Sequence, residues 1–420
     1  MTRVTAQPHH SREAPPSATF IARAVLAVFA LGVPLDVLPL SAAEGARSGE
    51  SILAALGLAL AAATAWQVVR TGRIRRPSVT LVLLAGFTAW AGMSFLWAAD
   101  SDAAERRIRT LAQLLGFVWL AWQIARSKRD LHWMAGGYVI GCSAVALLAW
   151  RAFMAGEQYR ESDQRYAATG FDPNDMGVTL AIGIPVAVYL ALDAKRRWGR
   201  LWMAYLPLSL SAIALSGSRG SVITASIAVV SALWLTLRRS VVTATVVMGV
   251  LAAIAVAGWS IVPENTWARI FTLGEQLGGG GKLGNRVPIW RAGLDFLARH
   301  PFAGAGVGNF GHVTSPDLGV NIVAHNTFLS VAVELGCVGA VLFLGVVVSI
   351  LFCALRRATE YQAIVVALLL TWTMGVASLT WEHRKTTWFV FLLGAALCSV
   401  RPGESGGRDD GVGAEPRTAA

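Results

Sequence analysis

Charged residues are scarce in this sequence, and their scarcity argues against a soluble fold. Asp, Glu, Lys and Arg make up 15% of the 420 residues, against about 25% in a typical soluble domain, while apolar residues reach 55%. Such a chain cannot cover its surface with polar groups in water. The four cysteines show no CxxC spacing, which argues against a disulfide framework or a zinc site. No cluster of Asp and Glu is of the kind that holds a divalent ion, so no metal site is expected.

Basic residues outnumber acidic ones and give a formal charge of +11, but they form no continuous patch. We therefore expect no nucleic-acid partner. The basic residues lie in short clusters between apolar runs, which is the usual pattern of cytoplasmic loops in a membrane protein. Runs such as 51–69, 80–97 and 241–262 reach or approach the ~20 apolar residues that cross a bilayer. The sequence thus predicts an all-α, polytopic integral membrane protein with membrane lipids around it.

About twelve transmembrane helices are predicted from these runs, with one long periplasmic loop at 263–325. When the N-terminus is placed in the cytoplasm, every short inside loop carries Lys or Arg. The multi-helix membrane domain is expected at 19–400, between a cytoplasmic tail at 1–18 and a disordered cytoplasmic tail at 401–420. The predicted helices span residues 19–40, 51–69, 78–97, 109–125, 131–153, 174–193, 201–216, 220–237, 241–262, 326–355, 361–380 and 386–400.

Lys and Arg are usually concentrated in the cytoplasmic loops of membrane proteins. Each arginine that is predicted on the outside face therefore calls for an explanation. For several, including Arg107 and Arg299, contact with lipid phosphates is a sufficient explanation. It explains Arg219 less well, because this residue lies in a very short turn, 216–220, between two apolar helices. Arg219 is either an interfacial arginine or part of an anion site, helped by the amides that begin the next helix.

The long loop contains a predicted amphipathic helix over 286–299, on the membrane surface or over a cavity. Its apolar residues recur at three- and four-residue spacing, and two arginines flank them. The apolar residues are Val287, Trp290, Leu294 and Leu297, and the arginines are Arg286 and Arg291. Residues 306–311 match GxGxxG, but a dinucleotide site also needs a preceding strand and a later acid. We interpret these residues as a tight, glycine-dependent turn.

His325 ends the loop, directly before a long apolar helix. A lone histidine at a helix start is usually a local hydrogen-bonding group. Here it lies at the outside boundary, shares its face with the unexplained arginines, and precedes Gly336 and Gly339, which permit close packing of helices. A neutral imidazole is the side chain best suited to accept a proton near neutral pH. Asp172 with Pro173 predicts a helix start.

Several of these elements together resemble the O-antigen ligase and O-antigen polymerase family of bacterial envelope glycosyltransferases. The most specific is His325-Asn326, followed after nine residues by Gly336 and after two more by Gly339. The others are residues 170–174 (Gly-Phe-Asp-Pro-Asn), 218–220 (Ser-Arg-Gly), Arg286 with Trp290, and the stretch from His300 to Gly306.

The resemblance implies that a glycan is transferred from undecaprenyl diphosphate to an acceptor hydroxyl. The transfer would be inverting and independent of metal and cofactor. His325 would be the catalytic base, and the donor diphosphate would contact Arg219, Arg286 and either Arg165 or the nearby Arg160. Possible supporting roles fall to three further residues: Asn326, Glu382 and Arg291. Charge stabilisation by arginines suits this chemistry because a diphosphate is already a competent leaving group.

The family resemblance leaves the acceptor open. It is lipid A-core for a ligase, another lipid-linked glycan for an O-antigen or exopolysaccharide polymerase, and a hydroxyl side chain for a protein O-glycosyltransferase; the spacing after His325 favours a ligase. A transporter would need related halves and broken helices that meet near the bilayer midplane, and the sequence shows no such repeat. We expect a multi-pass protein of the bacterial inner membrane whose active site faces the periplasm.

Overall fold

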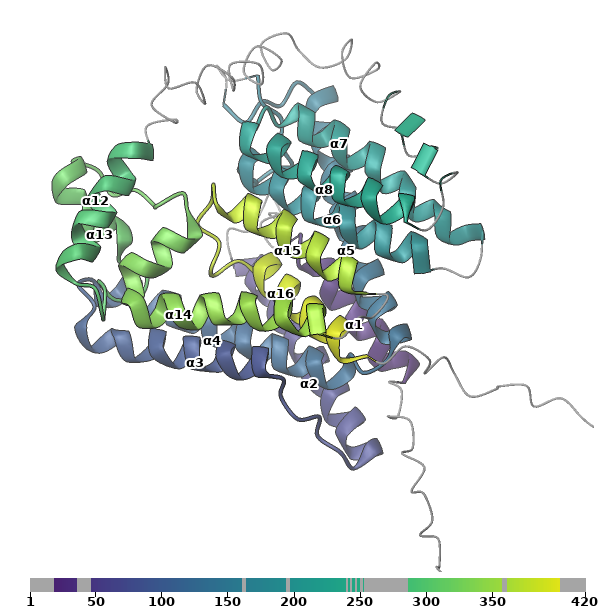
Figure 1. Ribbon diagram of the computed structural model, residues 1–420, viewed down its shortest axis with the longest axis horizontal. Helices are drawn as coiled ribbons and strands as arrows, with labels where there is room; N and C mark the ends of the chain where they lie inside the picture. The colour runs from purple at the N-terminus through teal and green to yellow at the C-terminus, as the bar shows by residue number, and fades with distance from the viewer. Residues whose placement is uncertain are drawn as a thin grey trace, which may run out of the picture.

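The computed structural model describes residues 19–35, 47–160, 164–193, 197–238, 286–356 and 361–400, with a few separate positions between 241 and 252. Within these ranges the regular structure is helical, and no strand occurs (Figure 1). The predicted tails at 1–18 and 401–420, nearly all of the predicted helix at 241–262 and the first part of the predicted loop lie outside the described residues.

Helices occupy the predicted positions on both sides of these gaps, and the proposed boundaries agree to within a few residues in most cases. Apolar runs bounded by Ser, Asp or Pro explain this, because such residues begin helices. The helices are α1 (Phe20–Gly32), α2 (Arg47–Thr71), α3 (Val79–Met93), α4 (Ser101–Ile124), α5 (Lys128–Met154), α6 (Pro173–Asp193), α7 (Tyr205–Leu215), α8 (Arg219–Leu237), α12 (Arg286–Arg299), α13 (Phe310–Leu318), α14 (Thr327–Arg356), α15 (Gln362–Val376) and α16 (Lys385–Ser399).

Among the described residues, five helical stretches are long and apolar enough to cross a membrane. The longest, α14, turns an apolar side outward, where Val341, Val348 and Phe352 are exposed, as expected of a helix in contact with lipid. The protein is therefore a membrane protein, and the number of twelve spans stays a prediction. The five stretches are Val79–Trp97, Lys128–Met154, Pro173–Leu192, Arg219–Leu237 and Thr327–Arg356.

Hydrogen bonds between loops divide the bundle into two ends. At one end, which we call the His325 end, the backbone N–H of Ala99 donates to Ala305 and that of Tyr166 donates to Leu215. At the opposite end, a guanidinium nitrogen of Arg126 donates to the backbone oxygen of Arg73 over 3.0 Å. The predicted alternation assigns the segments of the first set to one side of the membrane and those of the second set to the other. The threading stays a prediction.

Two short helices, α12 and α13, lie together at the His325 end (Figure 1). The predicted helix over 286–299 is confirmed. Ile289, Ala292 and Gly293 are buried, whereas Val287 and Leu294 are 42% and 55% exposed. The reason is close packing of small residues: a Cβ on Gly293 would lie 3.0 Å from the Phe310 ring of α13. The helix therefore turns its small residues inward and two large apolar ones outward.

A glycine break in α14 fixes the loop that precedes His325. Gly336 has φ 65° and ψ −167°, a conformation that is essentially restricted to glycine. A Cβ at this position would lie 2.0 Å from the backbone oxygen of Phe302. The backbone N–H of Cys337 donates to Pro301 and that of Ala305 donates to Val333, over 2.8 and 2.9 Å. From the sequence we expected Gly336 to pack closely against a second helix. Its close neighbour is instead the turn that contains Phe302.

The 306–311 segment forms the expected glycine-dependent turn. Gly306 and Gly308 have φ of 89° and 79°. A Cβ on Gly306 would lie 2.6 Å from the Cα of Ala98, so the turn approaches the segment between α3 and α4 more closely than a larger residue would allow.

Candidate active site

His325 is held at the start of α14 by the segment between α15 and α16. Its backbone N–H donates to the hydroxyl of Thr380 over 3.0 Å. The next residues continue the attachment, since the hydroxyl of Thr327 donates to the backbone oxygen of Leu379 and accepts from the N–H of Trp381, both over 2.8 Å. His325 has φ 48°, a left-handed conformation that is uncommon for residues other than glycine. These bonds therefore fix the backbone from which the imidazole extends.

The electrostatic environment keeps His325 neutral. Burial lowers the pKa of the imidazole, and the nearby positive charge of Arg286 lowers it further, while Asp172 and Asp175 act in the opposite direction. The half-buried Arg286 at the start of α12 and the two carboxylates of α6 are thus within electrostatic range of the histidine. A neutral imidazole near pH 7 can accept a proton.

Arg219 begins α8 in a turn that adjoins the same segment. Ser218 caps the helix, because its hydroxyl accepts a hydrogen bond from the N–H of Ser221. A Cβ on Gly220 would lie 2.9 Å from the hydroxyl of Ser378, two residues before the threonine that holds His325. The half-buried Arg219 side chain therefore starts from a turn packed against the 378–380 segment.

Arg165 is buried beside this turn. Its Nε donates to the backbone oxygen of Ser216 over 2.8 Å, and a terminal nitrogen donates to the side-chain oxygen of Asn174 over 3.0 Å. Arg160, the alternative that the sequence left open, is exposed and lies over the ring of Tyr159. Arg165, by contrast, joins the 216–221 turn to the start of α6.

The predicted start of α6 is confirmed. The carboxylate of Asp172 accepts from the N–H of Asn174 over 2.7 Å, and its backbone oxygen accepts from Met176 over 2.9 Å, so it is the residue that caps the helix. The backbone oxygen of Asn174 also accepts from the hydroxyl of Ser221 over 3.2 Å. The cap thus contributes one more tie between α6 and α8.

Two of the three predicted supporting residues, Asn326 and Arg291, are explained by their positions in helices. The side chain of Asn326 accepts from the N–H of Leu329 over 3.0 Å and so caps α14. Arg291 lies on the exposed side of α12, in contrast to the half-buried Arg286. The structure therefore brings Arg286, but not Arg291, toward His325.

The third supporting residue, Glu382, lies in a charged cluster that the sequence did not predict. Its side chain is 2% exposed, lies 3.9 Å from Arg107 of α4, and accepts from His383 over 3.0 Å if the ring nitrogen carries the proton. Arg107, for which we expected contact with lipid, therefore has a partner within the protein. Burial favours a higher pKa for Glu382, yet the pKa is lowered because His383 and Arg107 oppose that effect.

Glu334 of α14 joins the same cluster and was missed. Its carboxylate accepts from the backbone N–H groups of Gly308 and Phe310, over 2.7 and 3.3 Å, and the charges of Glu382 and Arg107 act on it. A signal was present in the sequence, because Glu334 is the one acid between 327 and 356. An ionisable residue inside an apolar helix marks a polar interior.

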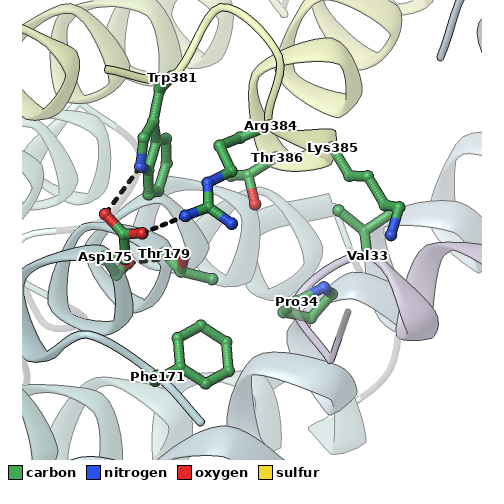
Figure 2. Close-up of a pocket in the computed structure, with 9 residues that line it drawn as sticks. All are labelled: Val33, Pro34, Phe171, Asp175, Thr179, Trp381, Arg384, Lys385 and Thr386. Atoms are coloured by element: carbon green, nitrogen blue, oxygen red, sulfur yellow. Dashed lines mark hydrogen bonds and ion pairs between the residues drawn. The ribbon is translucent and has the colours of Figure 1, made fainter. Parts of the chain in front are cut away.

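A second missed group surrounds Asp175. Its carboxylate accepts from the indole N–H of Trp381 over 3.0 Å and from a guanidinium nitrogen of Arg384 over 2.7 Å (Figure 2). These three side chains line a shallow, partly open hollow. In the described part of the chain, no three His, Cys, Asp or Glu side chains come together as metal ligands would.

The match to known proteins covers a third of the chain and contains the centre of this site. Residues 204–344 match the family model described as O-Antigen ligase. This stretch holds Arg219, Arg286 and His325, whereas Arg165 and Glu382 lie outside it. A search of curated proteins found no match to the chain. The resemblance stated from the sequence motifs is therefore confirmed over these residues.

Proposed function

Starting from this family match, we propose that the protein is a glycosyltransferase of the bacterial inner membrane with its active site facing the periplasm. It transfers a glycan from undecaprenyl diphosphate to a hydroxyl of lipid A-core. The main observation in support is that three predicted site residues lie close together. His325 is within electrostatic range of Arg286. The 378–380 segment holds the backbone of His325 and packs against the turn that contains Arg219. All three residues lie within the matched stretch.

In the proposed reaction, neutral His325 accepts the proton of the acceptor hydroxyl. The acceptor oxygen attacks the first carbon of the donor sugar from the side opposite the diphosphate. A new carbon–oxygen bond forms as the bond to the diphosphate breaks, so the configuration at that carbon inverts. The diphosphate leaves with both electrons of the broken bond.

The arginines stabilise the charge that develops on this leaving group. A guanidinium stays protonated and can pair two donors with two phosphate oxygens. Arg219 and Arg286 are the proposed contacts, and both are half-buried at the His325 end. Arg165 is already bonded to Ser216 and Asn174, so its proposed part is to position the Arg219 turn as well as to add positive charge.

The same chemistry would serve a polymerase, whose acceptor is a second lipid-linked glycan, and a protein O-glycosyltransferase. The deciding experiment uses the purified chain in liposomes with undecaprenyl-diphosphate glycan as donor. Lipid A-core, a second donor molecule and a peptide are offered as separate acceptors. We expect an inverted linkage to lipid A-core that forms equally well in EDTA. Elongation on undecaprenyl would instead show a polymerase, and glycan flux without covalent transfer would refute the proposal.

A further inference from the structure

The first turn of α6, residues 173–177, lies between the segments that carry Arg219 and hold His325. It contacts the 216–221 turn on one side and the 380–384 segment on the other. This turn of α6 lies outside the stretch that matches the family, so the match gives it no role. Its contacts are therefore the evidence for what it does.

The contacts with the 216–221 turn fix its position relative to α6. The backbone oxygen of Asn174 accepts from the hydroxyl of Ser221 over 3.2 Å, and the side-chain oxygen of Asn174 accepts from Arg165 over 3.0 Å. A Cβ on Gly177 would collide with the side chain of Ser221, so α6 and α8 approach each other as closely as glycine permits. The turn that carries the proposed diphosphate contact is thus attached directly to the start of α6.

Asp175 makes the contacts with the 380–384 segment. Its carboxylate accepts from the indole N–H of Trp381 over 3.0 Å and from the guanidinium of Arg384 over 2.7 Å (Figure 2). The Asp175 side chain is 16% exposed, so water competes little for these two bonds. The same segment accepts a hydrogen bond from the backbone N–H of His325 over 3.0 Å. One carboxylate therefore joins α6 to the segment that holds the proposed base.

Asp175 also acts on the imidazole through its charge. Among the described residues, the charged groups that act on His325 are Arg286 of α12 and two acids at the start of α6, Asp172 and Asp175. Burial and Arg286 lower the pKa of the imidazole, and the two acids raise it. A nearby carboxylate stabilises the imidazolium that forms when the base accepts a proton. Asp172 caps α6, whereas Asp175 in addition bonds the segment that holds the base.

The proposed reaction needs a fixed separation between the base and the diphosphate site. The acceptor oxygen attacks from the side opposite the diphosphate, so the donor carbon has to lie between His325 and Arg219. A displacement of about 1 Å in such an arrangement can lower the rate about 10²-fold. The first turn of α6 is bonded to the segments on both sides, so it is the element that can set this separation.

We propose that Asp175 is a positioning residue that holds His325 at a fixed distance from the Arg219 turn. It acts through its bonds to Trp381 and Arg384, and its charge stabilises the protonated imidazole. The inference rests on the proposed function, since this distance matters only if both residues serve one reaction.

The electrostatic part is tested without any transfer reaction. The full chain with isotope-labelled histidine is titrated in lipid nanodiscs, and NMR follows the imidazole signal that His325→Asn removes. Asp175→Asn should lower the pKa of His325, because a charge that favours the imidazolium is lost. The matched control is Asp130→Asn, which breaks an ion pair of the same 2.7 Å length, with Arg23, at the opposite end of the bundle. It should leave this pKa unchanged.

The positioning part is tested by kinetics in the liposome transfer assay. Asp175→Asn should lower kcat per folded molecule at least about tenfold, leave the KM for donor and acceptor within twofold, and move the acid limb of the pH profile to lower pH. Trp381→Phe removes the indole N–H and keeps the charge of Asp175, so it should lower kcat without moving the limb. Asp130→Asn should lower the unfolding temperature yet keep kcat and the limb.

The outcomes separate this proposal from the proposed function. An unchanged His325 pKa in Asp175→Asn overturns the proposal, whether or not transfer is observed. Native kcat per folded molecule in Asp175→Asn and Trp381→Phe, with lowered stability alone, would show a purely structural tie and would also overturn it. Absence of transfer by the native chain refutes the proposed function, and the imidazole titration still decides whether Asp175 acts on His325.

Discussion

The guanidinium of Arg107 lies 3.9 Å from the carboxylate of Glu382 and so ties α4 to the turn between α15 and α16. The Glu382 side chain is 2% exposed, and its charge acts on the carboxylate of Glu334. Two acids thus share one interior with Arg107. A buried acid that loses its cation is costly, because the charge then has neither water nor a partner.

Arg107→Leu should lower the free energy of unfolding by about 3 kcal/mol at pH 7. The folded-state pKa of Glu382 is lowered, so its stabilisation is present above the unfolded pKa of about 4.3 and is lost as pH falls through the folded pKa. The difference between variant and native protein should therefore shrink below about pH 4. Thermal unfolding in detergent across this range measures it. Arg106→Leu, an exposed change one residue earlier, is the control, and equal effects of the two would contradict the pairing.

His325→Asn should abolish glycan transfer, with a loss of at least about 10²-fold, because the general base is removed. Asparagine tolerates the left-handed conformation of residue 325 better than alanine, so the fold should be kept. The transfer rate in liposomes and the unfolding temperature are measured together. Near-native turnover with an intact fold would show that the histidine is not the base.

Arg219→Lys should lower kcat/KM for the lipid-diphosphate donor about 10- to 100-fold, since a charge-assisted hydrogen bond contributes about 1.5–3 kcal/mol. Lysine keeps the charge but cannot present the planar pair of donors. The KM for the acceptor should stay unchanged. Arg151→Lys, exposed at the same end, serves as the control. A rise in the KM for the acceptor alone would contradict this prediction, because it would show that Arg219 contacts the acceptor rather than the donor.

Asp172→Asn should move the acid limb of the pH profile to lower pH. Asp172 raises the pKa of His325, whereas burial and Arg286 lower it. Removal of this negative charge therefore lowers the histidine pKa further and keeps the base neutral in more acidic solution. Asparagine still caps α6, so the helix start is kept. The profile of kcat/KM between pH 4.5 and 8 measures the shift, and a limb displaced to higher pH would count against His325 as the titrating group.

Gly336→Ala should destabilise the protein by about 3 kcal/mol or more, because the backbone at this position is essentially open to glycine alone. The added methyl group would also meet the backbone oxygen of Phe302 at 2.0 Å. Gly116→Ala in α4, where nothing lies within 4 Å of the added atom, should leave stability unchanged or slightly raised. Comparable unfolding temperatures for the two variants would show that the break in α14 is not required.

The helices were predictable because membrane-length apolar runs and helix starts are local features. The start of α6 at Asp172-Pro173 and the bounds of α12 follow from a few neighbouring residues. The partners of Arg107 and Glu382 were not predictable, since 275 positions separate them and only the packing of α4 against α16 brings them together. The buried side of α12 was not predictable for a related reason, because Gly293 faces inward against the ring of Phe310, which lies in a separate helix.

The break at Gly336 separates α14 into a short helical cap that starts beside His325 and a long lipid-facing rod. Hydrogen bonds hold the cap to the 301–306 turn and to the 379–381 segment as well as to the rod. The same turn also holds the first residue of the rod, because the N–H of Cys337 donates to Pro301. A change in the 301–306 turn should therefore reach the start of α14, and with it the backbone of His325.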